Sequence, residues 1–192
     1  MALEDLIVRC RSYRRFDQSK RVARQTLLAL VDLARRTASA ANRQPLRYVL
    51  VETPEGCARL FPSLRWAAAL KDWPGPKEGE RPAAYVLVLL DTEVSKDAGC
   101  DHGIAAQSLL LAAVERGLGG CMLGAIDRPR IQRDFAIPPR YQVLLVVALG
   151  APAETCILED AAPGGDVTYW RDDRGVHHVP KRPLSEIVLD LP

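Results

Sequence analysis

The stretch Thr37-Ala-Ser-Ala-Ala-Asn-Arg-Gln-Pro-Leu-Arg-Tyr48 separates a segment of helical periodicity from a segment of strand character. Before it, apolar residues recur at helical spacing and predict a helix from about Arg24 to Thr37 with one buried face. After it, the apolar run Tyr48-Val-Leu-Val51 predicts a strand. The junction therefore indicates a helix that packs on a sheet, with a polar loop between them.

Three side chains in this loop have hydrogen-bonding groups of interest. The hydroxyl of Ser39 and the amides of Asn42 and Gln44 have the donors and acceptors needed to read the edge of a polar heterocycle. Ser and Asn are also ordinary turn residues, and Asn42 is equally suited to a helix C-cap. The loop alone leaves both interpretations open.

Further elements alternate irregularly along the chain. Continuous apolar runs predict interior strands at Ala84–Leu90 and Tyr141–Leu149. The segment Ile104–Val114 is apolar on almost every side, so it predicts a helix buried all round, which Gly117 ends. A small domain rarely encloses such a helix, and a subunit interface along it is the simplest explanation.

The C-terminal region predicts a hairpin. Its strands are Thr168-Tyr-Trp170 and Val176-His-His-Val179, around the turn Asp172-Asp-Arg-Gly175. The turn-rich loop from Trp73 to Pro82 is long enough to cover a site. The pattern as a whole predicts one domain over residues 1–192, of α+β class, with a mixed, mainly antiparallel central sheet flanked by helices.

Composition excludes several classes of protein. The chain has 192 residues, 48% hydrophobic and 26% charged, with a net charge of +2, which is too small to imply nucleic-acid or membrane binding. No apolar run approaches the ~18 residues of a membrane span, and no signal peptide is visible, so we expect a cytoplasmic protein. The five cysteines include no Cys-x-x-Cys pair, so we expect free thiols and no metal site.

Basic residues cluster near both ends of the chain. The segment Arg11-Ser-Tyr-Arg-Arg-Phe16 and the pair Lys181-Arg182 suit a phosphate, because guanidinium groups form bidentate pairs with phosphate oxygens and lysine adds a compact charge. The alternatives are a solvated basic face or, more remotely, a small nucleic-acid-binding module. The low net charge and the scarcity of interleaved aromatic residues argue against nucleic acid.

Taken in order, these segments resemble the FMN-dependent nitroreductase family. The family has an Arg-Ser-x-Arg-x-Phe stretch, then a Ser-x-x-Asn-x-Gln-Pro loop, and a basic pair near the C-terminus. The stretches Asp101–Ala113 and Gly117–Gly124 are similar to its central helix and to the strand that enters the flavin site. The resemblance covers nearly the whole chain and implies a nitroreductase-like homodimer that binds FMN.

The resemblance also implies roles for particular residues. Arg11, Ser12, Lys181 and Arg182 would hold the phosphate of FMN, and Arg14 would lie near the pyrimidine side of the ring. Asn42 and Gln44, supported by Ser39, would reach the flavin of the facing subunit. The backbone of Leu123 and Gly124 would lie beside the reactive edge. No side chain is assigned to acid–base catalysis. Cys10 stands where many members have an additional arginine, which removes one phosphate contact.

The activity implied is transfer of electrons from NADH or NADPH, bound transiently, to an electron-poor small-molecule acceptor such as a nitroaromatic or a quinone. Another reaction on the same fold, such as dehalogenation, flavin fragmentation or ring oxidation, is the alternative. A separate dinucleotide site of the Rossmann type is not indicated, because Met122 replaces the third glycine of the pattern that begins Gly117-x-Gly119.

Overall fold

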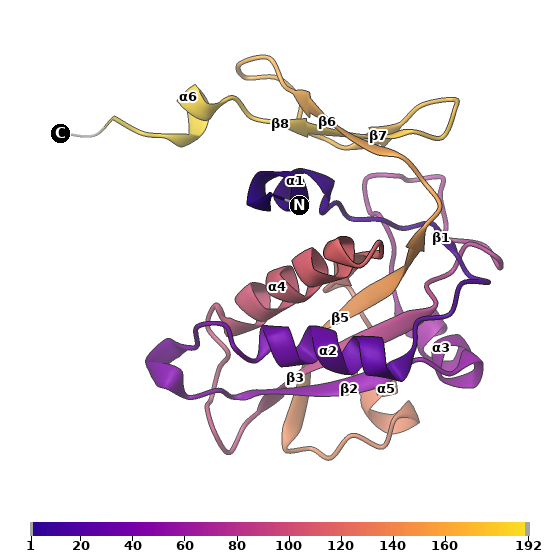
Figure 1. Cartoon of the computed structure of the whole chain (residues 1–192), viewed down its shortest axis with the longest axis vertical. Helices are drawn as coiled ribbons and strands as arrows, with labels where there is room; N and C mark the ends of the chain where they lie inside the picture. The colour runs from indigo at the N-terminus through magenta and orange to yellow at the C-terminus, as the bar shows by residue number, and fades with distance from the viewer. Residues whose placement is uncertain (1, 191–192) are drawn as a thin grey trace.

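The computed structural model describes residues 2–190 and shows a central antiparallel sheet between two layers of helices (Figure 1). The strand order is β1-β5-β3-β2, and β4 also pairs with β5. The strands are β1 (Phe16–Asp17), β2 (Leu46–Val51), β3 (Ala84–Asp91), β4 (Gly119–Leu123) and β5 (Tyr141–Pro152). Because β2 is an edge strand, its outer backbone groups are free to pair with another chain.

Two hydrophobic clusters cover the two faces of this sheet. Helices α2 (Arg24–Ala34) and α4 (Asp101–Glu115) pack against Ala84, Val86 and Val88 of β3. The alternate residues Tyr85, Leu87 and Leu89 face the second cluster, which includes residues of α3 (Pro54–Leu60) and α5 (Arg128–Asp134). Every residue of β3 is buried, which explains why this strand is a continuous apolar run.

A second, smaller sheet lies beyond α1 (Leu3–Arg9), at the top of Figure 1. Its order is β6-β8-β7, formed by β6 (Cys156–Asp160), β7 (Trp170–Arg171) and β8 (His177–Lys181). Strands β7 and β8 form the predicted hairpin, with Trp170 opposite His178. The parallel pairing of β6 with β8 was not predicted. The chain then continues through the short helix α6 (Leu184–Ile187) into a projecting tail.

The predicted α+β class with a mixed, mainly antiparallel sheet is confirmed. The first predicted helix ends earlier than expected, at Ala34, because its last turn tightens: the N–H groups of Arg36 and Thr37 bond to carbonyls three residues back. Gly117 has φ +73° and follows α4 as predicted. Across residues 2–190, no helix is long and apolar enough to cross a membrane.

The sequence predicted a central helix buried all round, with a subunit interface along it, and within one chain this helix is not fully covered. One stripe of α4, at helical spacing, is exposed or half-buried: Ile104, Gln107, Ser108 and Leu111. Ile104 is 40% exposed. The remaining faces of α4 pack on α2 and on the sheet. The apolar surface that sequence analysis detected is therefore present, but it is concentrated on one stripe.

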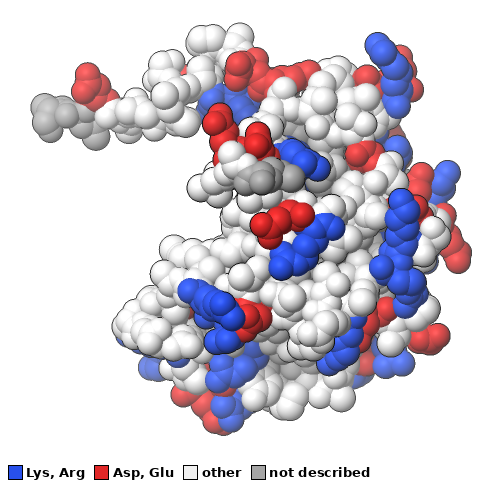
Figure 2. Space-filling model, in the orientation of Figure 1, with Lys and Arg blue, Asp and Glu red and all other residues white. Residues whose placement is uncertain are grey.

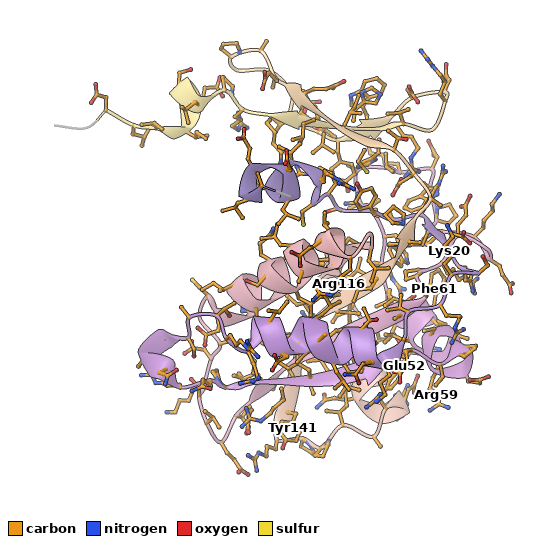
Figure 3. All side chains as sticks on the ribbon, viewed as in Figure 1. Lys20, Glu52, Arg59, Phe61, Arg116 and Tyr141 are labelled. Atoms are coloured by element: carbon orange, nitrogen blue, oxygen red, sulfur yellow. The ribbon has the colours of Figure 1, made fainter. Side chains whose placement is uncertain are left out.

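A buried carboxylate at the end of β3 joins the sheet to the polar loop. Asp91 accepts two 2.7 Å hydrogen bonds from Arg140 and lies 3.0 Å from Arg47. Its N–H donates to the carbonyl of Pro45, and Arg47 donates to the carbonyl of Gln44. At the other end of β2, Glu52, labelled in Figure 3, pairs with Arg24 of α2. These contacts position both ends of the helix–loop–strand unit.

We predict that Asp91→Asn lowers the urea midpoint of unfolding at pH 7, because Arg140 and Arg47 lose their carboxylate. The hydrogen bonds from Arg140 lower the pKa of Asp91. A carboxyl group with a lowered pKa stabilises the fold above its unfolded pKa, about 3.9, and loses that effect as the pH falls further. The difference between the urea midpoints of the wild-type protein and Asp91→Asn should therefore become smaller below about pH 4. Glu93→Gln, at an exposed partner of Arg140, is the control; an equal effect in both variants would contradict the assignment.

Candidate functional site

The N-terminal segment Arg11–Phe16 runs along the edge of the central sheet. The N–H of Tyr13 donates to the carbonyl of Gly120 at 3.0 Å, and Ser12 forms a parallel bridge with the same residue. A Cβ on Gly119 would lie 2.6 Å from the Tyr13 ring, so this glycine permits the basic segment to lie beside β4. A Cβ on Gly120 would lie 2.2 Å from the carbonyl of Ala148, so this glycine permits β4 to pair closely with β5.

The basic segment and the C-terminal sheet enclose a cavity of about 230 Å³, here called the anion cavity. Three of the four residues predicted for a phosphate, Arg11, Ser12 and Lys181, line it, together with Arg14, His177 and Tyr169. The Nε atom of Arg11 is buried and has no hydrogen-bond partner among residues 2–190. Arg182 does not line the cavity, because its guanidinium pairs with Glu186 of α6. The donors present fit a phosphoryl group.

The buried carboxylate of Glu154 holds this arrangement in place. It accepts hydrogen bonds from the backbone N–H groups of Arg14 and Arg15 and, at 2.7 Å, from the guanidinium of Arg171. The Arg14 guanidinium donates to the carbonyl of Ser12 at 3.2 Å and lies 4.8 Å from the centre of the Tyr169 ring. No carboxylate in the described part of the chain forms an ion pair with Arg14. Its positive charge therefore remains available to a ligand.

A second cavity of about 160 Å³, here called the edge cavity, adjoins the first and shares Arg14 and Tyr169 with it. The end of β4 forms one wall, with Leu123 and Gly124, the two residues predicted to lie beside a flavin edge. No atom lies within 4 Å of where a Cβ would be on Gly124. A flat ring can therefore approach the main chain closely there.

Trp66, Ala67 and Ala68 line the edge cavity and begin a segment that contacts the C-terminal sheet. The loop Trp73–Pro82, expected to cover a site, lines neither the edge cavity nor the anion cavity. Trp66 lines the cavity and packs 5.9 Å from Phe61, which is labelled in Figure 3. The N–H of Ala69 donates to the hydroxyl of Tyr169. Trp73 contacts the guanidinium groups of Arg15 and Arg171. The first part of the segment therefore covers a cavity, and Trp66 also packs in the core.

The polar loop is held from the start of α4. Ser39 donates its hydroxyl proton to Asp101 at 2.5 Å and accepts a 2.9 Å bond from the N–H of Gln44. Asp101 also accepts from the N–H of Ala40 at 3.0 Å, and its side chain is buried. Ser39 therefore stabilises the loop by internal hydrogen bonds. Its predicted part in binding a flavin stays a prediction.

The backbone of this loop adopts a conformation that residues other than glycine rarely take. Ala41, Asn42 and Gln44 have φ values of 50°, 52° and 51°. Such residues typically cost of order 1–3 kcal/mol each and persist where the surroundings impose them. The amide of Gln44 donates to the side-chain oxygen of Asn42 at 3.0 Å. The two predicted flavin-reading side chains are therefore adjacent and held in a fixed relation.

Within one chain, the residues predicted to bind a phosphate and the polar loop do not share a cavity. Ser39 and Gln44 line a cavity of about 620 Å³ between α2 and β2, whereas Asn42 does not line it. This loop cavity shares no lining residue with the anion or edge cavity. Sequence reasoning had placed these groups in one site shared by two chains. It did not find Glu154, Asp101, Tyr169 or His177, because their partners are distant in the sequence and no local pattern marks them.

Comparison with known proteins agrees with the fold and the order of the motifs. The model of the nitroreductase family matches residues 7–151. A candidate NADH dehydrogenase/NAD(P)H nitroreductase of Methanothermobacter thermautotrophicus is 30% identical over 75% of this chain and 74% of its own. A nitroreductase family protein of Clostridium difficile has a TM-score of 0.70 at 20% identity, covering 100% of this chain and 99% of its own.

One further solved structure carries a cofactor. It is that of a candidate nitroreductase from Exiguobacterium sibiricum in complex with FMN, with a TM-score of 0.67 at 16% identity, covering 80% of this chain and 90% of its own. The chain described here belongs to the nitroreductase family. The resemblance stated from the sequence is confirmed. The roles of the individual site residues stay predictions.

We predict that Ser39→Ala destabilises the chain by about 0.5–1.5 kcal/mol, because Asp101 and the Gln44 N–H each lose a hydrogen bond to the half-buried Ser39 hydroxyl. The exchange of the Gln44 amide proton should accelerate, as measured by hydrogen exchange with NMR detection. Ser39→Thr retains a hydroxyl and is the matched control. Unchanged exchange at Gln44 in the alanine variant would show that the hydroxyl does not hold the loop.

Proposed function

We propose that this chain is an FMN-dependent oxidoreductase that passes electrons from NADH or NADPH to an electron-poor acceptor such as a nitroaromatic or a quinone. The observation that carries the proposal is the pair of adjoining cavities: one lined by Arg11, Ser12 and Lys181, the other by the open backbone at Gly124. The family match, the FMN-bound structural neighbour and the name of the M. thermautotrophicus relative support it.

The groups lining the cavities match the chemistry of the cofactor. Arg11, Ser12 and Lys181 would bind the phosphate, and the unpartnered Nε of Arg11 would gain an acceptor. Leu123 and Gly124 would let the ring approach the main chain. When bound, FMN would supply the electron-transfer chemistry, and the protein would position it and set its electronics. Arg182, turned toward Glu186, would contribute only after its side chain moved.

Arg14 would set the electronics of the ring. A positive charge near the pyrimidine side favours the anionic reduced form over the neutral oxidised form. A unit charge at ~4 Å contributes about 4 kcal/mol at an effective dielectric near 20. Since ~30 mV corresponds to about 1.4 kcal/mol for a two-electron couple, the upper limit is a rise of roughly 90 mV. The absence of an ion-paired carboxylate on Arg14 within residues 2–190 preserves this effect.

We place Asn42 and Gln44 in the site of the facing subunit, so that each flavin needs two chains. The separation of the loop cavity from the anion cavity within one chain supports this assignment. Exposed apolar side chains also support a homodimer. They lie on α1, α4 and the tail: Leu3, Ile7, Val8, Ile104, Leu184, Ile187, Val188 and Leu189. Figure 2 shows that the projecting tail carries few charged residues and that the outline is hollowed beneath it.

The first test uses the purified full-length chain. We expect a yellow dimer in sedimentation experiments, a released pigment with the mass of FMN, and ping-pong kinetics with a reduced nicotinamide and a quinone or nitroaromatic. Ping-pong kinetics follow because the reductant leaves before the acceptor binds. Protein that contains no flavin and does not bind added FMN would refute the proposal.

We predict that Asn42→Ala raises the dissociation constant for FMN by about 2- to 10-fold, which corresponds to the loss of one hydrogen bond of ~0.5–1.5 kcal/mol. Ser95→Ala, in the turn after β3, should leave it unchanged. Fluorescence titration of the flavin-free protein measures both. Equal dissociation constants for FMN in the two variants would contradict the proposal that this loop binds the flavin.

A further inference from the structure

His177 is a buried histidine in the wall of the anion cavity. Its residue is 2% exposed, and it lies on β8 with its ring 5.3 Å from that of Tyr169. It lines the same cavity as Arg11, Ser12 and Lys181. The neighbouring His178 points to the other face of the strand, where it contacts Glu159 and Asp172. Of these two histidines, His177 alone therefore adjoins a site for an anion.

The contact with Arg14 determines which nitrogen of His177 carries the proton. The Nε2 atom lies 3.2 Å from Nη1 of Arg14. A guanidinium has only donors, so Nε2 must accept the hydrogen bond and the ring must be neutral, with its proton on Nδ1. That Nδ1 atom is buried and has no hydrogen-bond partner in the described chain. A buried donor without a partner calls for an explanation, and a missing ligand is one.

Without a ligand, the surroundings of His177 keep the ring neutral. Burial, followed by the positive charge of Arg14, lowers its pKa to about 4, whereas Glu154 acts in the opposite direction. The titratable and charged groups around it come from every adjacent element: Arg11, Arg14, Glu154, Cys156, Tyr169, Arg171, His178 and Lys181. Most of these charges are positive, and Glu154 is already bonded to Arg171. The cavity therefore has an excess of positive charge.

We propose that His177 couples anion binding to proton uptake: when a phosphoryl group binds in the anion cavity, His177 takes up a proton from solvent and releases Arg14. This proposal rests on the proposed function, because the expected anion is the phosphate of FMN. One proton from solvent forms an N–H bond at Nε2, and no other covalent bond changes. Protonated His177 then has two donors, so it can no longer accept from Arg14. The guanidinium, which already lies over Tyr169, becomes free to turn toward the ligand.

The direction of the effect follows from electrostatics. A dianion near the ring favours the charged form of histidine, as any opposite charge within about 4–6 Å does. Binding that takes up a proton must become tighter as the pH falls. A rise in pKa from about 4 to about 6 on binding gives a roughly fourfold lower dissociation constant at pH 5.5 than at pH 7.5. The same linkage requires that deprotonation weakens retention of the anion.

The test is NMR of the full-length chain with ¹⁵N-labelled histidine, first without ligand and then with FMN or inorganic sulfate. Sulfate is useful because its charge does not change between pH 5 and 8, whereas the phosphate of FMN titrates near pH 6. The chain has three histidines, and the His177→Gln and His178→Gln variants assign their signals. We expect His177 to be neutral with its proton on Nδ1 without ligand. Its pKa should rise by at least one unit when either anion binds.

The pH dependence of sulfate binding is a second, independent test. The dissociation constant for sulfate should fall about fourfold or more between pH 7.5 and 5.5 in the wild-type protein and in His178→Gln. It should change by less than about twofold in His177→Gln, whose side-chain oxygen can still accept from Arg14 but gains no proton. The His178 variant is the matched control, because that ring lies on the same strand and faces away from the cavity.

Each outcome decides the proposal. A proton on Nε2 in the ligand-free protein, or a pKa of His177 that FMN leaves unchanged, would overturn it. Equal pH dependence in wild type and His177→Gln would do the same. If His177→Gln does not fold, the wild-type NMR titration decides alone. FMN binding without protonation of His177 would refute this inference and leave the proposed function standing. A chain that binds neither FMN nor sulfate would refute both.

Discussion

The carboxylate of Glu154 connects parts of the chain that would otherwise have no fixed relation. Its side chain is 1% exposed and accepts from two backbone N–H groups of the N-terminal basic segment and from Arg171 of β7. A buried carboxylate is costly unless its hydrogen bonds are satisfied. Its burial therefore requires both the basic segment and the C-terminal sheet to be in place. The anion cavity lies between these two elements, so its existence depends on this one buried group.

The polar loop is organised in the same way at the other side of the molecule. Asp101, buried at the start of α4, accepts hydrogen bonds from the Ser39 hydroxyl and from the N–H of Ala40. The loop that follows Ala40 bends through three residues with positive φ. Asp91 and Arg47 secure the end of the loop where β2 begins. In both regions a buried carboxylate group from a distant part of the chain accepts hydrogen bonds from the backbone of a polar segment. Both polar segments are therefore held in place by hydrogen bonds within the chain itself.

The sequence allowed the local features to be predicted, and the long-range ones only through the family resemblance. The continuous apolar run of β3, the turn at Gly117 and the hairpin of β7 and β8 follow from periodicity and turn residues. Glu154 could not be identified, because its partner Arg14 is 140 positions away, and Ser39 is 62 positions from Asp101. The sequence indicated that one small domain would not cover all of α4, but it did not say which face stays exposed, because hydropathy measures the apolar content of a helix and not what covers each face. The parallel pairing of β6 and β8 likewise depends on chain topology.

Arg14 shows how these constraints combine. It lies between the anion and edge cavities, contacts Tyr169 and His177, and forms no ion pair with a carboxylate in residues 2–190. Arg171, which contacts the same glutamate, differs because its guanidinium pairs with the Glu154 carboxylate directly. The Glu154 carboxylate thus accepts hydrogen bonds from the backbone N–H groups of Arg14 and Arg15, while it forms its ion pair with Arg171. The Arg14 segment is therefore held in place while the Arg14 guanidinium keeps its charge free of an ion pair within residues 2–190, which favours an anion beside it.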